Sequence, residues 1–164
     1  MRPPQASQHE KMVEDEDEEP FASRVQQMHF SQADPNYAVM QGFADFSWYT
    51  KDQGQTFSRH AFGPAVELKM HPTQPEMLLA SRYEGEFPHR SLSLFISEDF
   101  GKEWKKIASN IFQFQWADPE MKGRTDKTIL ACMRRADTEP KTAFTSWDPN
   151  IDFVISDDLF ATQR

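Results

Sequence analysis

The sequence has little cysteine, little glycine and no long apolar run. Cys132 is the single cysteine among 164 residues, which excludes an internal disulfide and a cysteine-cluster metal site. The longest unbroken apolar run, residues 129–133, is far below the roughly 18 residues that indicate a membrane span. The six glycines are few for a fold rich in tight turns. We therefore expect a chain without a membrane span that is held together by apolar contacts rather than cross-links.

Clustered positive charge is also absent. The chain carries 18 basic and 26 acidic residues, and most of the net charge of -8 lies in residues 1–20, which hold seven acids and two bases. Because phosphate binding needs clustered Lys and Arg, nucleic acid is excluded as the expected partner. The six consecutive acids at 14–19 repel one another, so residues 1–20 are predicted to be a disordered acidic leader. Residues 1–5 lack the apolar core of a secretory signal peptide.

Aromatic residues are abundant, at 13% of the chain with 14 Phe and 4 Trp, which argues against disorder beyond the leader. From Val25 onward, apolar and polar residues alternate over short segments such as 28–30, 66–70, 92–96 and 112–116. This period of two indicates strands with one buried face. No stretch keeps a helical period for more than two turns. The predicted fold class is therefore all-β.

These strands recur in a repeated order. A strand, a proline-containing turn, an apolar strand, an aromatic-aliphatic strand and an acidic turn run through residues 25–57, again through 66–104, and more weakly through 112–160. The aspartates of the acidic turns lie 47 and 59 residues apart. A four-stranded propeller blade takes about 40–50 residues. Residues 21–164 are therefore predicted to form about three four-stranded blades of a larger β-propeller, the last with an insertion.

The acidic turns match the Asp-box pattern Ser/Thr-x-Asp-x-Gly-x-x-Trp/Phe. The glycine allows a positive φ, while the carboxylate and the hydroxyl can accept backbone N–H groups inside the turn. The closing aromatic residue is expected to pack between sheets. The predicted structural residues are Thr50, Asp52, Gly54 and Phe57 in the first copy, Ser97, Asp99, Gly101 and Trp104 in the second, and Ser156 and Asp158 in the third. In the third copy Phe160 stands where glycine should be, so either that turn is altered or its register is wrong.

The phrase LFISEDFGKEWKKI at 94–107 resembles the blades of sortilin and of the yeast carboxypeptidase Y receptor, which form the VPS10-domain family. The segments LKMHP at 68–72, IFQFQW at 111–116 and KTIL at 127–130 are similar to the same family. The resemblance covers residues 25–160. It implies a ten-bladed propeller in the Golgi and endosomal lumen that binds soluble protein or peptide cargo without chemistry and transports it between those compartments.

The chain departs from this family pattern in extent. About three blades are present, and the signal sequence, the cysteine-rich module and the membrane helix of the family are not. Since three blades cannot close a ring, we expect a fragment of a longer receptor, or a chain that completes its ring with other subunits. No local motif matches the surroundings of the family's cargo-binding arginine, so the cargo-binding residues are not assigned.

Two other functions stay open. Asp boxes also occur in sialidases, whose chemistry needs a tyrosine nucleophile activated by a glutamate, and Tyr83 and Glu84 follow Arg82 directly. Neighbours on a strand face opposite sides, so this pair converges only if the segment is a loop. A soluble propeller scaffold inside the cell would fit the missing signal peptide. We expect no enzyme, with no catalytic residues, no metal and no cofactor.

Three further features have structural interpretations. His29 and His71 occupy equivalent or nearly equivalent repeat positions, which indicates blade structure rather than a metal pair. Cys132 is expected to be a buried strand residue, with a reactive thiol as the alternative. Residues 84–90 form a predicted loop insertion, and loops carry function more often than strands do, so this loop is a candidate contact surface.

Overall fold

The computed structural model describes residues 24–43, 45–86, 90–135 and 150–162; the predicted leader at 1–20 lies outside these ranges. Every helix or strand assigned within them is a strand, which confirms the all-β prediction. The strands are β1 (Val25–Phe30), β2 (Ala38–Gly42), β3 (Phe46–Thr50), β4 (Ser58–Ala61), β5 (Glu67–Met70), β6 (Leu78–Glu84), β7 (Ser91–Ser97), β8 (Lys105–Ala108), β9 (Ile111–Trp116), β10 (Ile129–Arg134) and β11 (Ile151–Ser156).

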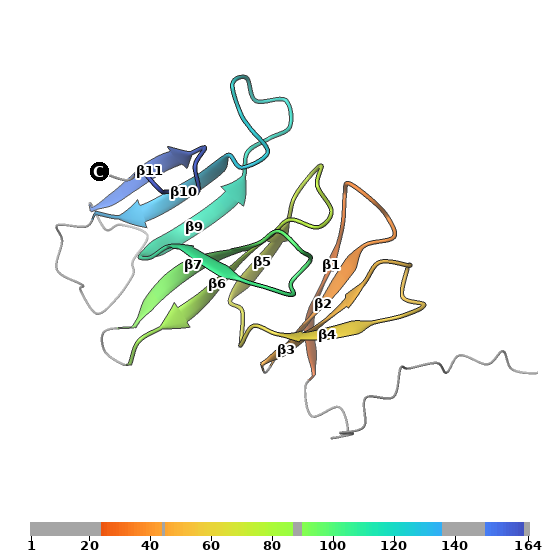
Figure 1. The fold of residues 1–164 in the computed structure, drawn as a ribbon. Helices are drawn as coiled ribbons and strands as arrows, with labels where there is room; N and C mark the ends of the chain where they lie inside the picture. The colour runs from red at the N-terminus through yellow and green to blue at the C-terminus, as the bar shows by residue number, and fades with distance from the viewer. Residues whose placement is uncertain (1–23, 44, 87–89, 136–149, 163–164) are drawn as a thin grey trace, which may run out of the picture.

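The strands form three antiparallel sheets that follow one another along the chain (Figure 1). The first sheet has the order β1-β2-β3-β4 and the second has the order β5-β6-β7-β8. The third sheet, β11-β10-β9, has three strands within the described residues, where four were predicted. In each sheet, strands that are consecutive in sequence lie side by side, as in a propeller blade.

One backbone hydrogen bond recurs at the loop between the first two strands of every sheet, and it fixes which residues correspond. The N–H to carbonyl pairs are Ser31 to Tyr37 at 3.0 Å, His71 to Met77 at 2.9 Å, and Ala117 to Thr128 at 3.0 Å. Each pair brackets the loop that the sequence places at a proline-containing turn. The strand registers on either side then align the three sheets residue by residue.

This alignment places the two histidines at nearby rather than identical positions of the repeat. His71 corresponds to Ser31, whereas His29 lies two positions earlier in its own sheet. The His71 ring stabilises its turn as a serine hydroxyl would, because its Nδ1 accepts the N–H groups of Thr73 at 3.1 Å and Gln74 at 2.9 Å. The Ser31 hydroxyl accepts two backbone N–H groups in the same way, at 3.1 and 3.2 Å.

Apolar side chains fill the spaces between neighbouring sheets. Val39 and Tyr49 of the first sheet pack with Leu68, Leu78 and Phe100 of the second sheet and its turn. A larger cluster joins the second sheet to the third, and its buried members are Leu79, Leu94, Ile96, Ile111, Phe114, Trp116, Ile129, Ala131, Met133 and Phe160. Fully burying one such side chain stabilises the fold by roughly 1.5–3 kcal/mol, so these clusters hold the sheets face to face.

The outermost faces of the first and third sheets differ from these interfaces. Met28 and Phe30 on β1 are 56% and 69% exposed, although their alternation predicts a buried face. The prediction is wrong there because no sheet among the described residues covers that side of β1. Phe153 and Ile155 on β11 are likewise exposed.

Candidate functional site

The three acidic turns share one hydrogen-bond arrangement. In each, the hydroxyl of the first residue accepts the N–H four positions later and donates to the carboxylate two positions later. The accepting pairs are Thr50 with Gly54 at 2.8 Å, Ser97 with Gly101 at 2.8 Å, and Ser156 with Phe160 at 2.7 Å. The carboxylate pairs are Thr50 with Asp52 at 2.8 Å, Ser97 with Asp99 at 2.8 Å, and Ser156 with Asp158 at 3.0 Å. The third turn therefore keeps the same bonds despite its phenylalanine.

The carboxylate of Asp52 is further held by the following residues. It accepts the Thr56 hydroxyl at 2.6 Å and the Thr56 N–H at 2.9 Å. These bonds, the hydroxyl first, favour the ionised carboxylate and lower the pKa of Asp52 from 3.8 to about 2. The Asp52 side chain is half-buried, and its oxygens accept hydrogen bonds from residues of its own turn.

The fifth residue of each turn has a left-handed backbone. Its φ is 86° at Gly54, 85° at Gly101 and 63° at Phe160. Only glycine adopts this conformation without steric cost. Phe160 is nevertheless 7% exposed, because its ring lies in the cluster between the second and third sheets. Burial of that ring offsets the strain of its backbone.

The closing aromatic residues of the first two turns behave differently. Trp104 packs beside Phe62 with ring centroids 4.3 Å apart, and its indole N–H donates to the Gly101 carbonyl at 3.1 Å. Phe57 is 42% exposed, so the expectation that it packs between sheets is wrong. The cause is its position: Phe57 belongs to the first sheet, whose outer side has no described neighbour.

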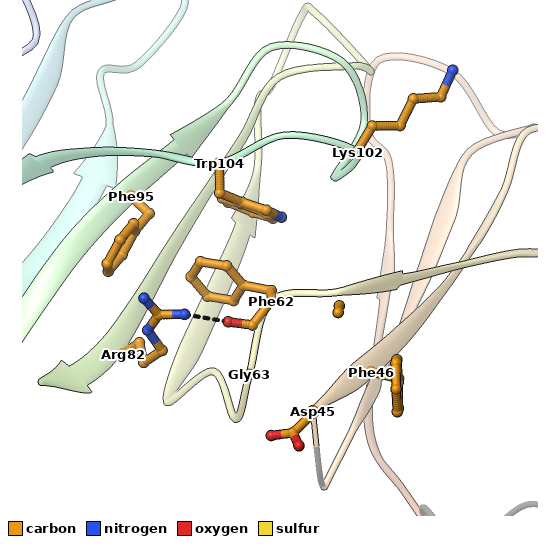
Figure 2. Close-up of a pocket in the computed structure, with 9 residues that line it drawn as sticks. Asp45, Phe46, Phe62, Gly63, Arg82, Phe95, Lys102 and Trp104 are labelled. Carbon is orange, nitrogen blue, oxygen red and sulfur yellow. Dashed lines mark hydrogen bonds between the residues drawn. The ribbon is translucent and has the colours of Figure 1, made fainter.

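A cavity of about 640 Å³ lies between the first and second sheets (Figure 2). It lies beside the crossover, residues 62–66, which connects β4 to β5. Figure 2 shows the Phe62 ring between Trp104 and Arg82. The guanidinium of Arg82 lies 5.0 Å from the Phe62 ring and 4.6 Å from the Phe95 ring, and it donates to the Phe62 carbonyl at 2.5 Å. Arg82 therefore fastens the crossover to the second sheet.

The chemistry of this cavity is aromatic and cationic. Besides these four residues its lining includes Asp45, Phe46, Ala61, Gly63 and Lys102. No hydroxyl, thiol or imidazole is among these lining residues, and the ionisable groups of the lining are those of Asp45, Arg82 and Lys102. Sequence reasoning missed this cavity, because Phe62 and Trp104 lie 42 positions apart and neither belongs to an alternating strand segment.

The residues considered for sialidase chemistry lie on strand β6 and diverge. Arg82 and Glu84 share one face, with Nη2 and Oε1 3.4 Å apart, and Tyr83 points to the other face. The Lys106 ammonium donates to Glu84 at 2.6 Å and lowers the pKa of that carboxyl. Tyr83 instead lies beneath the Arg90 guanidinium at 4.8 Å. Glu84 is thus a paired anion that cannot activate Tyr83.

The predicted contact loop at 84–90 is only partly described. Glu84 ends β6, Gly85 and Glu86 follow it, and residues 87–89 lie outside the described ranges. Arg90 returns to the sheet at the Tyr83 ring. The loop stays a prediction as a contact surface.

A second, smaller cavity of about 300 Å³ lies beside β5 and β9. Its polar lining consists of Glu67, Lys69, Gln113 and Gln115, which we call the β5–β9 groove. Glu67 and Lys69 form an ion pair at 2.9 Å. Both β5 and β9 are edge strands of their sheets. The groove therefore combines strand edges with side chains that donate and accept hydrogen bonds.

The sequence also singled out the thiol of Cys132. Cys132 is half-buried on β10 and forms part of the wall of the second cavity, so it is less buried than predicted.

In the described ranges, no three His, Cys, Asp or Glu side chains gather where they could hold a metal ion. Those ranges also contain no helix of the length and apolarity needed to cross a membrane.

Comparison with known families gives one match over most of the chain. The model of the Sortilin-Vps10 family, described as sortilin, neurotensin receptor 3, matches residues 6–164. The matched range contains the eleven strands of the described residues and the three acidic turns. A search of curated proteins returned no match.

Proposed function

Because the chain belongs to the Sortilin-Vps10 family, we propose that it forms part of a receptor domain that binds protein or peptide cargo and transports it between the Golgi and endosomes. The family match over residues 6–164 carries this proposal. The propeller-like sheets of the described residues agree with it.

The described residues favour binding over catalysis. Tyr83 and Glu84 lie on opposite faces of β6, and Glu84 is paired with Lys106. The lining of the cavity between the first two sheets has no tyrosine that could serve as the nucleophile of a sialidase. Sialidase chemistry therefore has no support in the geometry.

The β5–β9 groove is the surface that we assign to cargo. An extended peptide can add its backbone hydrogen bonds to an edge strand, and side-chain contacts beside that edge supply selectivity. The Glu67–Lys69 pair and the amides of Gln113 and Gln115 can exchange hydrogen bonds with such a peptide. The cavity at this groove, whose lining also includes the apolar side chains of Phe114, Leu130 and Phe153, has a volume of about 300 Å³, which is large enough for a few peptide side chains.

Peptide selection tests this assignment. Peptides displayed on phage are selected against the immobilised chain, and the best synthetic peptide is titrated by fluorescence polarisation. We expect Lys69→Glu to weaken its binding at least tenfold. Lys105→Glu, the same charge reversal on the outer strand β8, is the matched control and should leave the affinity within twofold. Selection of no peptide, or equal loss in both variants, would overturn the groove assignment.

The compartment is tested separately. A tagged full-length protein is expected to overlap Golgi and endosome markers. A uniform cytosolic distribution would instead favour the intracellular scaffold and would refute the transport role.

A further inference from the structure

An ion pair connects each two neighbouring sheets. The Lys51 ammonium lies 2.5 Å from the Glu76 carboxylate and joins the first sheet to the second. The Lys127 ammonium lies 2.7 Å from the Glu98 carboxylate and joins the third sheet to the second. The hydrogen bond from Lys51 lowers the pKa of Glu76, so this carboxyl is ionised at neutral pH. All four side chains are about half exposed, so each pair adds little stability, but like charges in the same place would oppose an incorrect partner.

The two ion pairs occupy the same positions of the repeat with their charges exchanged. Lys51 and Glu98 each directly follow the hydroxyl residue of their acidic turn. Glu76 and Lys127 each directly precede the residue whose carbonyl accepts the recurring loop hydrogen bond. The acidic turn therefore supplies the cation at the first interface and the anion at the second.

A buried contact at the same two interfaces exchanges side-chain size in the same way. Tyr49 and Ile96 correspond, since each directly precedes the hydroxyl residue of its acidic turn. At the first interface the Tyr49 ring fills the space that a side chain on Gly101 would need. At the second interface Ile96 lies in one buried cluster with Phe160, which holds the position of that glycine. The larger residue thus belongs to the earlier sheet at the first interface and to the later sheet at the second.

These contacts oppose a direct interface between the first and third sheets. Such an interface would place Lys51 beside Lys127, so that two like charges meet. It would also place the Tyr49 ring against Phe160 in a space that admits only a glycine. Like charges in contact and overfilled space both destabilise an interface. The first sheet is therefore matched to the second sheet and not to the third.

The same contacts oppose the packing of the second sheet on the second sheet of another copy. Glu98 would then lie beside Glu76, and Ile96 beside Gly101, where the smaller side chain leaves space unfilled. Burial of apolar surface has no direction, so by itself it does not distinguish these arrangements. The charged and size-matched contacts supply that distinction.

We propose that this exchange of charge and size between the two interfaces selects which sheets become neighbours during folding. It keeps a sheet from being skipped or duplicated, both within one chain and between two chains. Sheets of one repeat resemble one another, and this resemblance is the condition under which repeat proteins mispair and swap domains. Specific pairing then requires contacts that penalise the incorrect partner as well as contacts that favour the correct one. Cargo binding is not required for this selection.

Charge exchange at one interface tests the proposal without removing an ion pair. Lys51→Glu with Glu76→Lys keeps opposite charges at the first interface but gives both interfaces the same polarity, so the first sheet also becomes compatible with Lys127. Glu98→Lys with Lys127→Glu does the same from the second interface. The combination of all four substitutions reverses both pairs and restores the alternation.

Refolding of the complete chain provides the measurement. Each protein is diluted from urea at several concentrations, and size-exclusion chromatography separates monomer from mispaired oligomer. We expect each double variant to form roughly twofold more oligomer than the unmodified chain, because the size-matched contacts are still in place. The fourfold variant should return to the value of the unmodified chain. The urea midpoints of the refolded monomers should stay close to one another, since every variant retains both ion pairs.

An ion pair within one sheet provides the matched control. Arg135 and Asp152 lie 2.7 Å apart and link the end of β10 to β11. Arg135→Asp with Asp152→Arg exchanges these charges without changing an interface between sheets, so the oligomer fraction should stay that of the unmodified chain. Three results would overturn the proposal: equal oligomer in the double variants and the unmodified chain, a fourfold variant that mispairs as much as the doubles, or an equal rise in the control.

Discussion

The ring of Tyr49 occupies the space that a side chain on Gly101 would need. A Cβ added to Gly101 would lie 2.3 Å from Cε1 of Tyr49, a separation that real Cβ atoms essentially never show. Tyr49 lies on β3 of the first sheet, and Gly101 lies in the acidic turn of the second. The glycine thus serves two purposes, because its φ of 85° closes the turn and its missing side chain admits the neighbouring sheet.

Gly101→Ala should therefore destabilise the fold more than Gly54→Ala does. The two glycines have almost the same φ, at 85° and 86°, so each alanine pays about 1–2 kcal/mol of backbone strain. At Gly54 the nearest atom to an added Cβ is the exposed Phe57 ring at 3.4 Å, whereas at Gly101 a buried ring must move. Overpacking adds about 1–3 kcal/mol. Urea unfolding of both variants measures the difference, and equal losses would contradict this account.

A smaller residue at position 49 should remove most of that extra cost. At the corresponding place between the second and third sheets, Ile96 replaces the tyrosine and Phe160 replaces the glycine, and both lie in one buried cluster. In the first contact the large Tyr49 faces a glycine, and in the second the smaller Ile96 faces a phenylalanine. In a double-mutant cycle with Tyr49→Ile and Gly101→Ala, we expect about 1–2 kcal/mol of favourable coupling. Additive losses would show that the two sites do not share this space.

Acid should weaken the fold through His71. The buried ring accepts two N–H groups at Nδ1, and its Nε2–H donates to the Asp126 carbonyl at 2.9 Å, which requires the neutral imidazole. Burial lowers the pKa of His71 below 6.5, so the unfolded chain binds the proton first. The free energy of unfolding should therefore fall as the pH drops below 6.5.

His71→Ser tests this pH dependence. Serine supplies an acceptor oxygen, as Ser31 does at the corresponding position of the first sheet. The variant should lose part of the stability decrease below pH 6.5, measured by urea midpoints between pH 7 and pH 5. Burial also lowers the pKa of His29 and His60, and these should retain the rest of the slope. An unchanged slope would exclude His71 as its source.

Asp52 should contribute a second loss of stability at lower pH. Its pKa falls from 3.8 to about 2 on folding, because the ionised carboxylate accepts the Thr56 hydroxyl and N–H. The stabilisation is present above pH 3.8 and disappears as the pH falls toward 2. Asp52→Asn should lower the urea midpoint at pH 7 and flatten its change between pH 4 and pH 2. A variant that retains the full acid dependence would contradict this role.

Features set by neighbours in sequence could be predicted from the sequence. The bonds of an acidic turn join residues within four positions, so the Ser/Thr-x-Asp spacing was sufficient to place Thr50, Asp52 and Gly54. Strand alternation identified the β-structure, and the repeated phrase at 94–107 identified the family. Features that depend on a neighbouring sheet could not be predicted in this way. Alternation does not say whether a neighbouring sheet covers Met28, and Phe57 and Trp104 occupy the same place in their motifs yet differ in burial.

The few glycines of the chain show what the sequence determines and what the tertiary structure determines. The sequence by itself determined that Gly54 and Gly101 close turns and that Phe160 interrupts the pattern, because backbone preference is a property of each residue. Only the tertiary structure explains why a phenylalanine fits at position 160 while even an alanine at position 101 should destabilise the fold. The space at each turn is set by a side chain of the preceding sheet. That side chain lies 52 residues before Gly101 in sequence, so only the packed sheets bring the two together.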